Sequence, residues 1–365
     1  MRLLPRAGVV LAAPLLALVV AGLVTSLVLI GVGQSVAEFW GVVFTVPSPR
    51  LAVSIVNGAS ILYLSGLAAA VAFRMNLFNI GVEGQYRVAT FAAAYFAGEA
   101  LLPGYLNTIV AICVAMVAGA LWAGIAAILR VTRGVSEVIS TIMLNAIAGG
   151  LVAYLLRELG EQQGQIRRTT TIQESSWVGS IPLVPGEPSQ VYGLAVLAIV
   201  AGVAFAVILN RTRFGFDLRA TGRSETAAVA SGINVKRMVV STMLLSGAVA
   251  GLIGMLDLFG NSHAYGSTIQ VGIGFTGIAV ALLGRNNPAG IAVGALVFAF
   301  LSAQSNALGI EAGISPEIVA VTQGVIVLSV VIAYELVRRY QVRIEQNEVA
   351  RALAQDRARE AEVRA

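Results

Sequence analysis

The chain has 365 residues, of which 57% are hydrophobic and 12% are charged, and its mean hydropathy is +0.84. Soluble proteins average roughly 45–50% apolar and about 25% charged residues, so this composition excludes a soluble globular protein and predicts an all-α, polytopic membrane protein. The net charge of +5 does not indicate nucleic-acid binding, because the basic residues stand at the ends of apolar segments, as they do in cytoplasmic loops of membrane proteins.

Cysteine and histidine are too scarce for several kinds of site. Cys113 is the one cysteine and His263 the one histidine, which excludes a disulfide within the chain and a multi-histidine metal centre. The sequence contains no GxxxxGK[ST] phosphate-binding loop and no nucleophile elbow, so we expect neither an enzyme nor a bound metal or cofactor. A transporter of this composition that used ATP would need a partner subunit to bind it.

The first apolar segment, residues 8–32, starts a series of predicted membrane spans. Its length of about 25 residues exceeds the core of a cleavable signal peptide, so we expect a span whose N-terminus lies inside the cell. Residues 33–50 then form an external loop, and residues 51–73 lead back to the cytoplasmic side.

A polar segment follows the second predicted span. Arg74–Gln85 reads RMNLFNIGVEGQ and places Asn79, Glu83 and Gln85 between hydrophobic residues. A carboxylate at membrane depth is costly unless it is paired, and irregular backbone is tolerated there only where protein or a watery cavity surrounds it. The segment is therefore either a cytoplasmic turn before the next span or a broken helix that lines a substrate pathway.

The next two spans bring a second polar side chain to membrane depth. Residues 88–98 lead to an external loop, and residues 108–129 return to Arg130 and Arg133 on the inside. Asn145 follows on an apolar segment, where its amide has four hydrogen-bonding valences to fill. It is either a contact between helices or a ligand contact.

Arg157–Gln190 is the longest polar stretch, and glycine and proline interrupt it. The order of the spans places it outside, although Arg167 and Arg168 depart from the excess of basic residues expected inside. The stretch is either a surface that receives a delivery protein or a passive linker.

The loop Asn210–Arg237 fixes the orientation of the chain. It carries six basic residues between two apolar runs, which places it in the cytoplasm. Within it, Ser224–Gly232 is rich in alanine, lacks proline and ends in glycine, which predicts a short surface helix. A helix of such small residues either docks against another protein or is a solvated connector.

The remaining apolar segments complete ten predicted spans, with both termini inside. Residues 238–259 are rich in small residues, which favours close packing between helices. Residues 272–283 are too short for a full span and contain glycine, which indicates a discontinuous helix near a substrate pathway. We expect this segment to lie beside the polar segment that precedes Gln85, as the matching element of a second half. The last spans are residues 289–308 and 317–336.

Four stretches of the chain resemble the permease subunits of bacterial nucleoside-type ABC importers, whose wider family includes ribose and branched-chain amino-acid permeases. They are Ala72–Gln85 (AFRMNLFNIGVEGQ), Gly134–Asn145 (GVSEVISTIMLN), Phe214–Gly232 and Gly274–Gly290 (GFTGIAVALLGRNNPAG). The NIGVEGQ sequence is similar to the nucleoside branch rather than the sugar branch. The resemblance implies that residues 1–337 form a transmembrane permease domain with a coupling loop at 210–237. The charged residues of 338–365 predict a solvated cytoplasmic tail after it.

The resemblance also implies two groups of functional residues. The substrate pathway would be lined by Asn79, Glu83, Gln85, Asn145 and Phe275. In the importer family a cytoplasmic coupling helix docks on the ATPase, with the pattern Glu-Ala-Ala, three residues, then Gly. Here Thr226 occupies the acidic position and Glu225 precedes it, so the docking register departs from the family pattern. The coupling residues would be Arg219, Gly222, Glu225, Thr226, Ala227, Ala228 and Gly232.

The resemblance implies a multi-pass protein of the inner or plasma membrane that imports nucleosides. Its partners would be an ABC ATPase, a second, non-identical permease chain, a substrate-binding lipoprotein and membrane lipid, with no nucleic acid. Asn and Gln amides suit nucleosides because they both donate and accept hydrogen bonds. The alternatives are a sugar or amino-acid permease of the same superfamily and an ion-coupled secondary transporter, for which Glu83 is the only suitable carboxylate.

Overall fold

The computed structural model describes residues 6–266, 269–315 and 317–330, together with residues 332, 333, 336, 339, 343 and 346, and it describes side chains from residue 19 onward. The chain divides into two compact units, one of residues 45–304 and one that combines the residues before 45 with those after 304. The predicted charged tail, residues 338–365, lies outside the described residues except for three positions.

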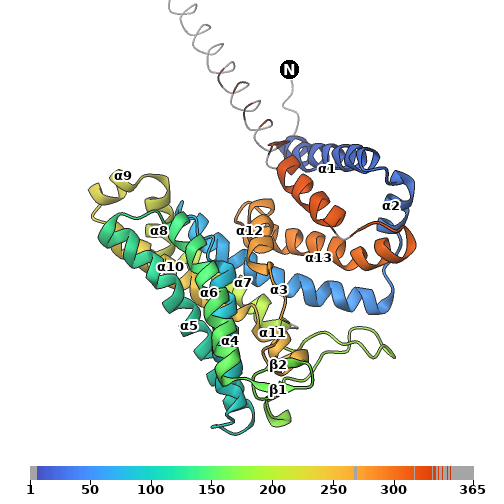
Figure 1. Cartoon of the computed structure of the whole chain (residues 1–365). Coiled ribbons are helices and arrows are strands. Elements are labelled where there is room, and N and C mark those ends of the chain that lie inside the picture. Colours follow the sequence, from blue (N-terminus) through green and yellow to red (C-terminus); the bar gives the residue numbers. More distant parts are fainter. Residues whose placement is uncertain are drawn as a thin grey trace, which may run out of the picture. The chain divides into compact units, whose positions relative to one another are not determined.

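Helices make up most of the described chain (Figure 1). The unit that contains the residues before 45 begins with α1 (Arg6–Gly31) and α2 (Val36–Val43). The helices that start within residues 45–304 are α3 (Pro49–Phe73), α4 (Val82–Gly98), α5 (Gly104–Arg133), α6 (Glu137–Leu159), α7 (Ala195–Arg211), α8 (Arg213–Arg223), α9 (Glu225–Ala230), α10 (Val235–Leu252), α11 (Met255–Asp257), α12 (Ile273–Leu283) and α13 (Pro288–Glu311). A helix without a label follows at Glu317–Val330, and the other elements are a two-stranded antiparallel hairpin, β1 (Glu161–Gln163) and β2 (Ile166–Arg168), and the short helical turns η1 (Glu174–Ser176) and η2 (Leu258–Ser262).

The predicted polytopic, all-α fold is confirmed. Five helices of the described residues are long and apolar enough to cross a membrane: α3, α5, α6, Val235–Ser262 and Pro288–Ile310. A sixth span results if α7 and α8, which are bent by 73° relative to each other, are counted together. Each of the ten predicted spans contains a helix, but α4 and α12 have only 17 and 11 residues, so the chain combines full spans with shorter ones.

Capping residues explain where several helices start and end. Ser48 accepts a hydrogen bond from the Leu51 amide and precedes Pro49, so α3 begins with a side-chain cap and a proline at its first position. Asn234 caps α10 in the same way. Gly134 adopts a left-handed conformation with φ of 67° and ends α5, as glycine does at many helix C-termini.

Small residues bring α5 and α10 into backbone contact. A Cβ atom added to Gly119 would lie 2.3 Å from the carbonyl oxygen of Gly247, and one added to Gly251 would lie 2.3 Å from the carbonyl oxygen of Ala115. Neither helix could carry a larger side chain at these positions without moving apart. The close packing predicted for residues 238–259 is thus present, and it is of the kind that holds membrane helices together without a hydrophobic driving force.

The long polar stretch between α6 and α7 folds back onto the segment after η2. The amides of Thr169 and Ile172 donate to the carbonyls of Tyr265 and His263, each at 2.9 Å. The ring of His263 also stacks on that of Trp177, with centroids 3.7 Å apart. This part of the stretch is therefore a packed element of its unit and does not behave as a free linker.

Candidate functional site

The helix pair α3 and α4 is interrupted by a non-helical segment, Arg74–Gly81, which we call the polar break. Asn76 adopts a left-handed conformation in it, with φ of 60°. Side chains on both sides of the break contact the start of α12, and these contacts show where α4 begins relative to α3. Ser65 of α3 donates to the carbonyl of Ile273 at 2.9 Å, and Glu83 of α4 accepts from the neighbouring Gly272 amide at 2.9 Å.

Ser65 stands eight residues before the end of α3, a distance of about 12 Å along a helix. Since Glu83 and Ser65 both contact the start of α12, α4 begins well back from the end of α3 rather than beyond it. This geometry favours the broken helix over a simple cytoplasmic turn. The start of α12 also lies against the start of α4, so the two interrupted segments adjoin as expected.

Glu83 caps the N-terminus of α12. Its side chain is 3% exposed, and its two carboxylate oxygens accept hydrogen bonds from the amides of Gly272 and Gly274, at 2.9 and 2.8 Å. A helix N-terminus stabilises a negative charge through its free amides and its dipole. Gly274 is needed for this approach, because a Cβ there would lie 2.3 Å from the Glu83 nitrogen. The buried carboxylate is thus satisfied by the protein itself.

Asn79 and Gln85 form a reciprocal amide pair inside the protein. The Asn79 Nδ2 donates to Gln85 Oε1 at 3.0 Å, and Gln85 Nε2 donates to Asn79 Oδ1 at 2.9 Å. Asn79 also donates to Ser246 Oγ of α10 at 2.8 Å and accepts from the Gly81 amide at 3.0 Å. Both side chains are buried. The pair fixes the polar break to α10, and all four valences of Asn79 are used in doing so.

Asn145 of α6 holds the same segment from another side. Its Oδ1 accepts from the Gly84 amide and its Nδ2 donates to the Ile80 carbonyl, both at 2.8 Å. Of the two alternatives for this residue, the described conformation favours a contact between helices. Phe275 is separate from this network, since it lies on α12 with a side chain that is 49% exposed. The structure therefore brings four of the five predicted pathway residues together and leaves Phe275 at the surface.

The surface helix predicted within the loop of residues 210–237 is α9. Ser224 caps it by accepting from the Ala227 amide at 3.2 Å. Thr226, Ala227 and Gly232 are exposed, and Val229 is exposed as well, whereas Ala228 is buried against the rest of its unit. Every residue of α9 except Ala228 is thus exposed, and these residues form the surface that α9 offers to a partner.

The preceding helix, α8, was not predicted. Its buried residues Gly215, Leu218 and Thr221 recur every three positions, which is the signal that could have identified it. Gly222 lets α8 lie directly on the polar break, because a Cβ there would be 2.5 Å from the Arg74 carbonyl oxygen. Arg219 is partly buried beside this contact, and its Nη1 has no hydrogen-bond partner within the described residues.

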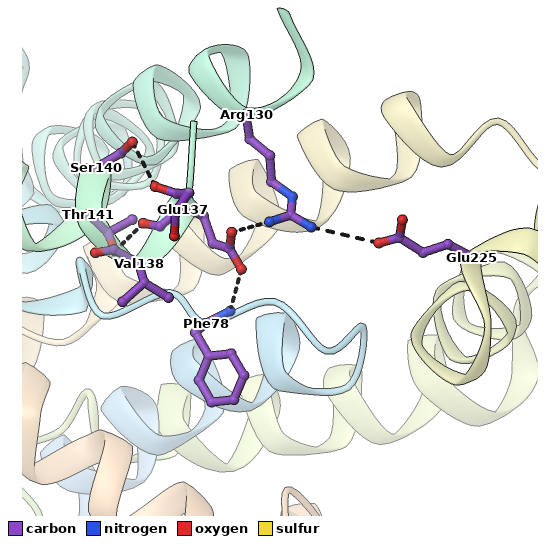
Figure 2. Close-up of polar contacts among 8 residues, drawn as sticks. Phe78, Arg130, Glu137, Val138, Ser140, Thr141 and Glu225 are labelled. Carbon is purple, nitrogen blue, oxygen red and sulfur yellow. Dashed lines mark hydrogen bonds and ion pairs between the residues drawn. The ribbon is translucent and has the colours of Figure 1, made fainter. Parts of the chain in front are cut away.

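An ion-pair network joins α9 to the polar break (Figure 2). Arg130, near the end of α5, forms a salt bridge with Glu137 at the start of α6. The other carboxylate oxygen of Glu137 accepts from the Phe78 amide at 3.3 Å, and Nη2 of Arg130 lies 3.7 Å from a carboxylate oxygen of Glu225. Glu225, the candidate substitute for the acidic position of the docking pattern, therefore faces an arginine of its own chain. The sequence reasoning had not assigned Arg130 or Glu137 to the site.

No three His, Cys, Asp or Glu side chains come together as metal ligands would in the part of the chain that the structure describes. The site instead consists of amide and carboxylate groups that connect interrupted helices, with a small exposed helix at one end. Such an arrangement can fix and move helices, but it offers no acid–base pair for chemistry.

Comparison with known families decides between the classes of membrane protein. A family model described as "Branched-chain amino acid transport system / permease component" matches residues 51–332, most of the chain. The chain belongs to this permease family. Membership makes the protein a membrane-spanning component of a transport system rather than an enzyme.

The permease is also similar to individual members of known transporters. It is 35% identical to the guanosine ABC transporter permease protein NupP of Bacillus subtilis, over 75% of this chain and 78% of NupP. A second guanosine permease protein of that bacterium, NupQ, is 29% identical over 68% of this chain and 79% of NupQ. The nucleoside permease NupB of Lactococcus lactis is 32% identical over 88% and 90% of the two chains, and the glucose permease TsgB13 of Haloferax volcanii 31% over 91% and 89%.

Proposed function

We propose that the permease is the transmembrane subunit of an ATP-driven ABC importer of nucleosides, and that it forms the translocation pathway together with a second, related permease chain. The observation that carries the substrate class is the 35% identity to a guanosine permease along about three quarters of both chains. A second, non-identical permease is supported by the similarity to both NupP and NupQ, two permease proteins of one organism.

The energy for import would come from a separate ATPase that docks on α9. The sequence has no phosphate-binding loop of its own, and α9 exposes small side chains and Val229 beside Glu225. A small-residue helix allows a partner to approach its backbone closely. In this proposal α9 and both termini lie in the cytoplasm, and a binding lipoprotein delivers substrate from the outside.

Within the pathway, the buried amides and Phe275 would have different tasks. Asn79, Gln85 and Asn145 fix the polar break and have their hydrogen bonds satisfied inside the protein. Phe275 is exposed on α12, one residue after Gly274, whose amide bonds Glu83. Aromatic rings stack on nucleobases with about 1–3 kcal/mol per base, which suits a nucleoside contact at this position. The amide network would then place α12, and Phe275 would meet the base.

The ion-coupled alternative depends on Glu83 as a carrier of protons or sodium. In the structure both oxygens of that carboxylate are occupied by amides of α12. Loading an ion there would require the cap to open, so the contacts favour a structural carboxylate. The sugar alternative retains one specific observation in its favour, the similarity to TsgB13.

Uptake by the reconstituted transporter tests these proposals. The complete complex, placed in vesicles, is expected to accumulate radiolabelled guanosine only with ATP, and uptake should be unaffected by an uncoupler. Unlabelled nucleosides should compete, whereas glucose and branched-chain amino acids should not. Competition by glucose alone would reassign the substrate class, and uptake that needs a proton gradient but no ATP would exclude an ABC importer.

A further inference from the structure

Arg130 and Glu137 form a chain of polar side-chain contacts from α9 to the polar break. Arg130 lies between two carboxylates, that of Glu137 on α6 and that of Glu225 on α9 (Figure 2). Glu137 in turn accepts from the backbone of Phe78, inside the break. Four elements, namely α5, α6, α9 and the break, therefore meet at one guanidinium and one carboxylate.

The two ion pairs of Arg130 differ in strength. The Glu137 side chain is 7% exposed, and it also bonds the Phe78 amide, so loss of Arg130 would leave a buried carboxylate without its counter-charge. The Glu225 side chain is 60% exposed and 3.7 Å from Arg130, which is the geometry of a weak, solvent-screened pair. The inner pair is thus built to persist, and the outer one can form and break as α9 moves.

Glu137 does more than stabilise the start of its own helix. An acidic residue in the first turn of α6 would interact favourably with the helix dipole in any case. Here, however, its carboxylate turns away to bond an arginine of α5 and an amide of the break (Figure 2). Those two contacts serve the connection between elements and contribute nothing to capping α6.

A second contact, between α8 and the polar break, would transmit movement of the loop to the break as well. Gly222 of α8, two residues before the cap of α9, lies on the Arg74 carbonyl, so α8, which leads directly into α9, abuts the break through its backbone. The break is fixed beyond that point to α10 through Asn79, and α4 after it caps α12 through Glu83. A displacement of α9 that reached Phe78 would therefore act on the segment that positions both interrupted helices.

We propose that Arg130 and Glu137 are positioning residues that transmit movement of α9 to the polar break. Glu225 is the residue of α9 through which this movement reaches Arg130. This inference rests on the proposed docking of an ATPase on α9. It assigns a coupling role to an ion pair outside both predicted groups of site residues, and it gives Glu225 an inward task in place of a contact with the ATPase.

Three variants of the complete transporter, with the ATPase, second permease and binding protein, test the proposal. Glu225→Gln removes only the exposed outer pair, Arg130→Gln removes both pairs, and Arg133→Gln is the control, since Arg133 is exposed in the last turn of the same helix and has no ion pair among the described residues. The readouts are nucleosides transported per ATP hydrolysed, and hydrogen exchange of the peptide that contains Phe78 before and after a non-hydrolysable ATP analogue is added.

The control should match the wild type in both readouts. Glu225→Gln should lower the transport per ATP about two- to fivefold, as loss of an exposed ion pair predicts, and Arg130→Gln should lower it about tenfold. ATP hydrolysis should continue in both variants, and the nucleotide-dependent change in exchange at Phe78 should shrink in the first and disappear in the second. The variant that combines Glu225→Gln with Arg130→Gln should transport as much nucleoside per ATP as Arg130→Gln alone, because both changes act along one route. If Arg130→Gln prevents assembly, Glu225→Gln decides, since it leaves the buried pair intact.

Wild-type transport per ATP in Glu225→Gln, together with a wild-type exchange response at Phe78, would overturn the proposal. Failure of the proposed function has a different signature: the wild-type complex itself would take up no nucleoside. In that case the exchange response, which needs only ATPase binding and no transported substrate, would still report whether Arg130 and Glu137 connect α9 to the break.

Discussion

Asn79 uses all of its hydrogen-bonding capacity within the protein, and this changes what its substitution should do. A residue that only contacts a ligand can be truncated without loss of stability, whereas a buried amide that links two elements cannot. We expect Asn79→Ala to lower both uptake and thermal stability, because Gln85, Ser246 and the Gly81 amide each lose a partner. An unsatisfied buried polar group costs about 1–3 kcal/mol. Thermal unfolding in detergent, followed beside uptake, measures both effects.

Phe275→Ala provides the contrast at the residue scale. Its ring is 49% exposed, so we expect the variant to keep the wild-type unfolding temperature while the apparent KM for nucleoside rises about fivefold or more, as loss of a base–aromatic contact predicts. Equal loss of stability in both variants would show that Phe275 is a packing residue. Unchanged stability in Asn79→Ala would instead return that amide to the group of ligand contacts.

At the scale of elements, α9 has two faces with different tasks. Val229 is 61% exposed and Ala228 is 2% exposed. We therefore expect Val229→Asp to prevent co-purification of the ATPase without lowering the yield of the permease, because it places a charge in an apolar contact. Ala228→Trp should lower the yield of folded permease, because no space exists beside that methyl group. The reverse result, with Ala228→Trp well folded but free of ATPase, would mean that α9 docks through its other face.

The stability contributed by the contact between His263 and Trp177 should depend on pH. His263 follows the span that ends at Ser262, and burial lowers the pKa of its imidazole below the usual 6.5, with Asp257 opposing part of that shift. Between the lowered pKa and 6.5 the unfolded chain binds more protons than the folded one, so stability rises with pH through this window and is lost as the pH falls through it. We expect thermal stability to fall more steeply from pH 7 to 5 in the wild type than in His263→Asn. Identical slopes would show that the ring titrates freely.

At the scale of the whole molecule, the sequence predicted where helices and interruptions lie, but not how the interruptions are closed. Apolar length and loop charge predicted a helix in each of the ten spans, and alanine content predicted α9. The partners of the polar residues could not be found in this way, because Asn79 pairs with Ser246 and Glu83 with Gly272, positions 167 and 189 residues away. No periodicity relates residues so far apart. From the sequence alone these side chains could equally have faced a watery pathway, and only the packing of α10 and α12 against them shows that they are paired inside the protein.

Orientation in the membrane is the property on which the docking and pathway proposals both depend. Cys113 is the one cysteine of the chain, so replacing it by alanine gives a background for labelling at single introduced cysteines. We expect Val229→Cys to react with a membrane-impermeant maleimide only in inside-out vesicles, and Glu187→Cys only in right-side-out vesicles, because α9 belongs to the basic loop and Glu187 to the long polar stretch.

Addition of the ATPase should then protect Val229→Cys and leave Glu187→Cys unchanged. Labelling of the two positions from the same side would contradict the span count between them, since an odd number of crossings must separate α9 from the polar stretch. Labelling of Val229→Cys from the outside alone would reverse the orientation, and with it the side on which any ATPase could act. Protection on the expected side, by contrast, would place the motor where Glu225 and Arg130 can connect its movement to the polar break.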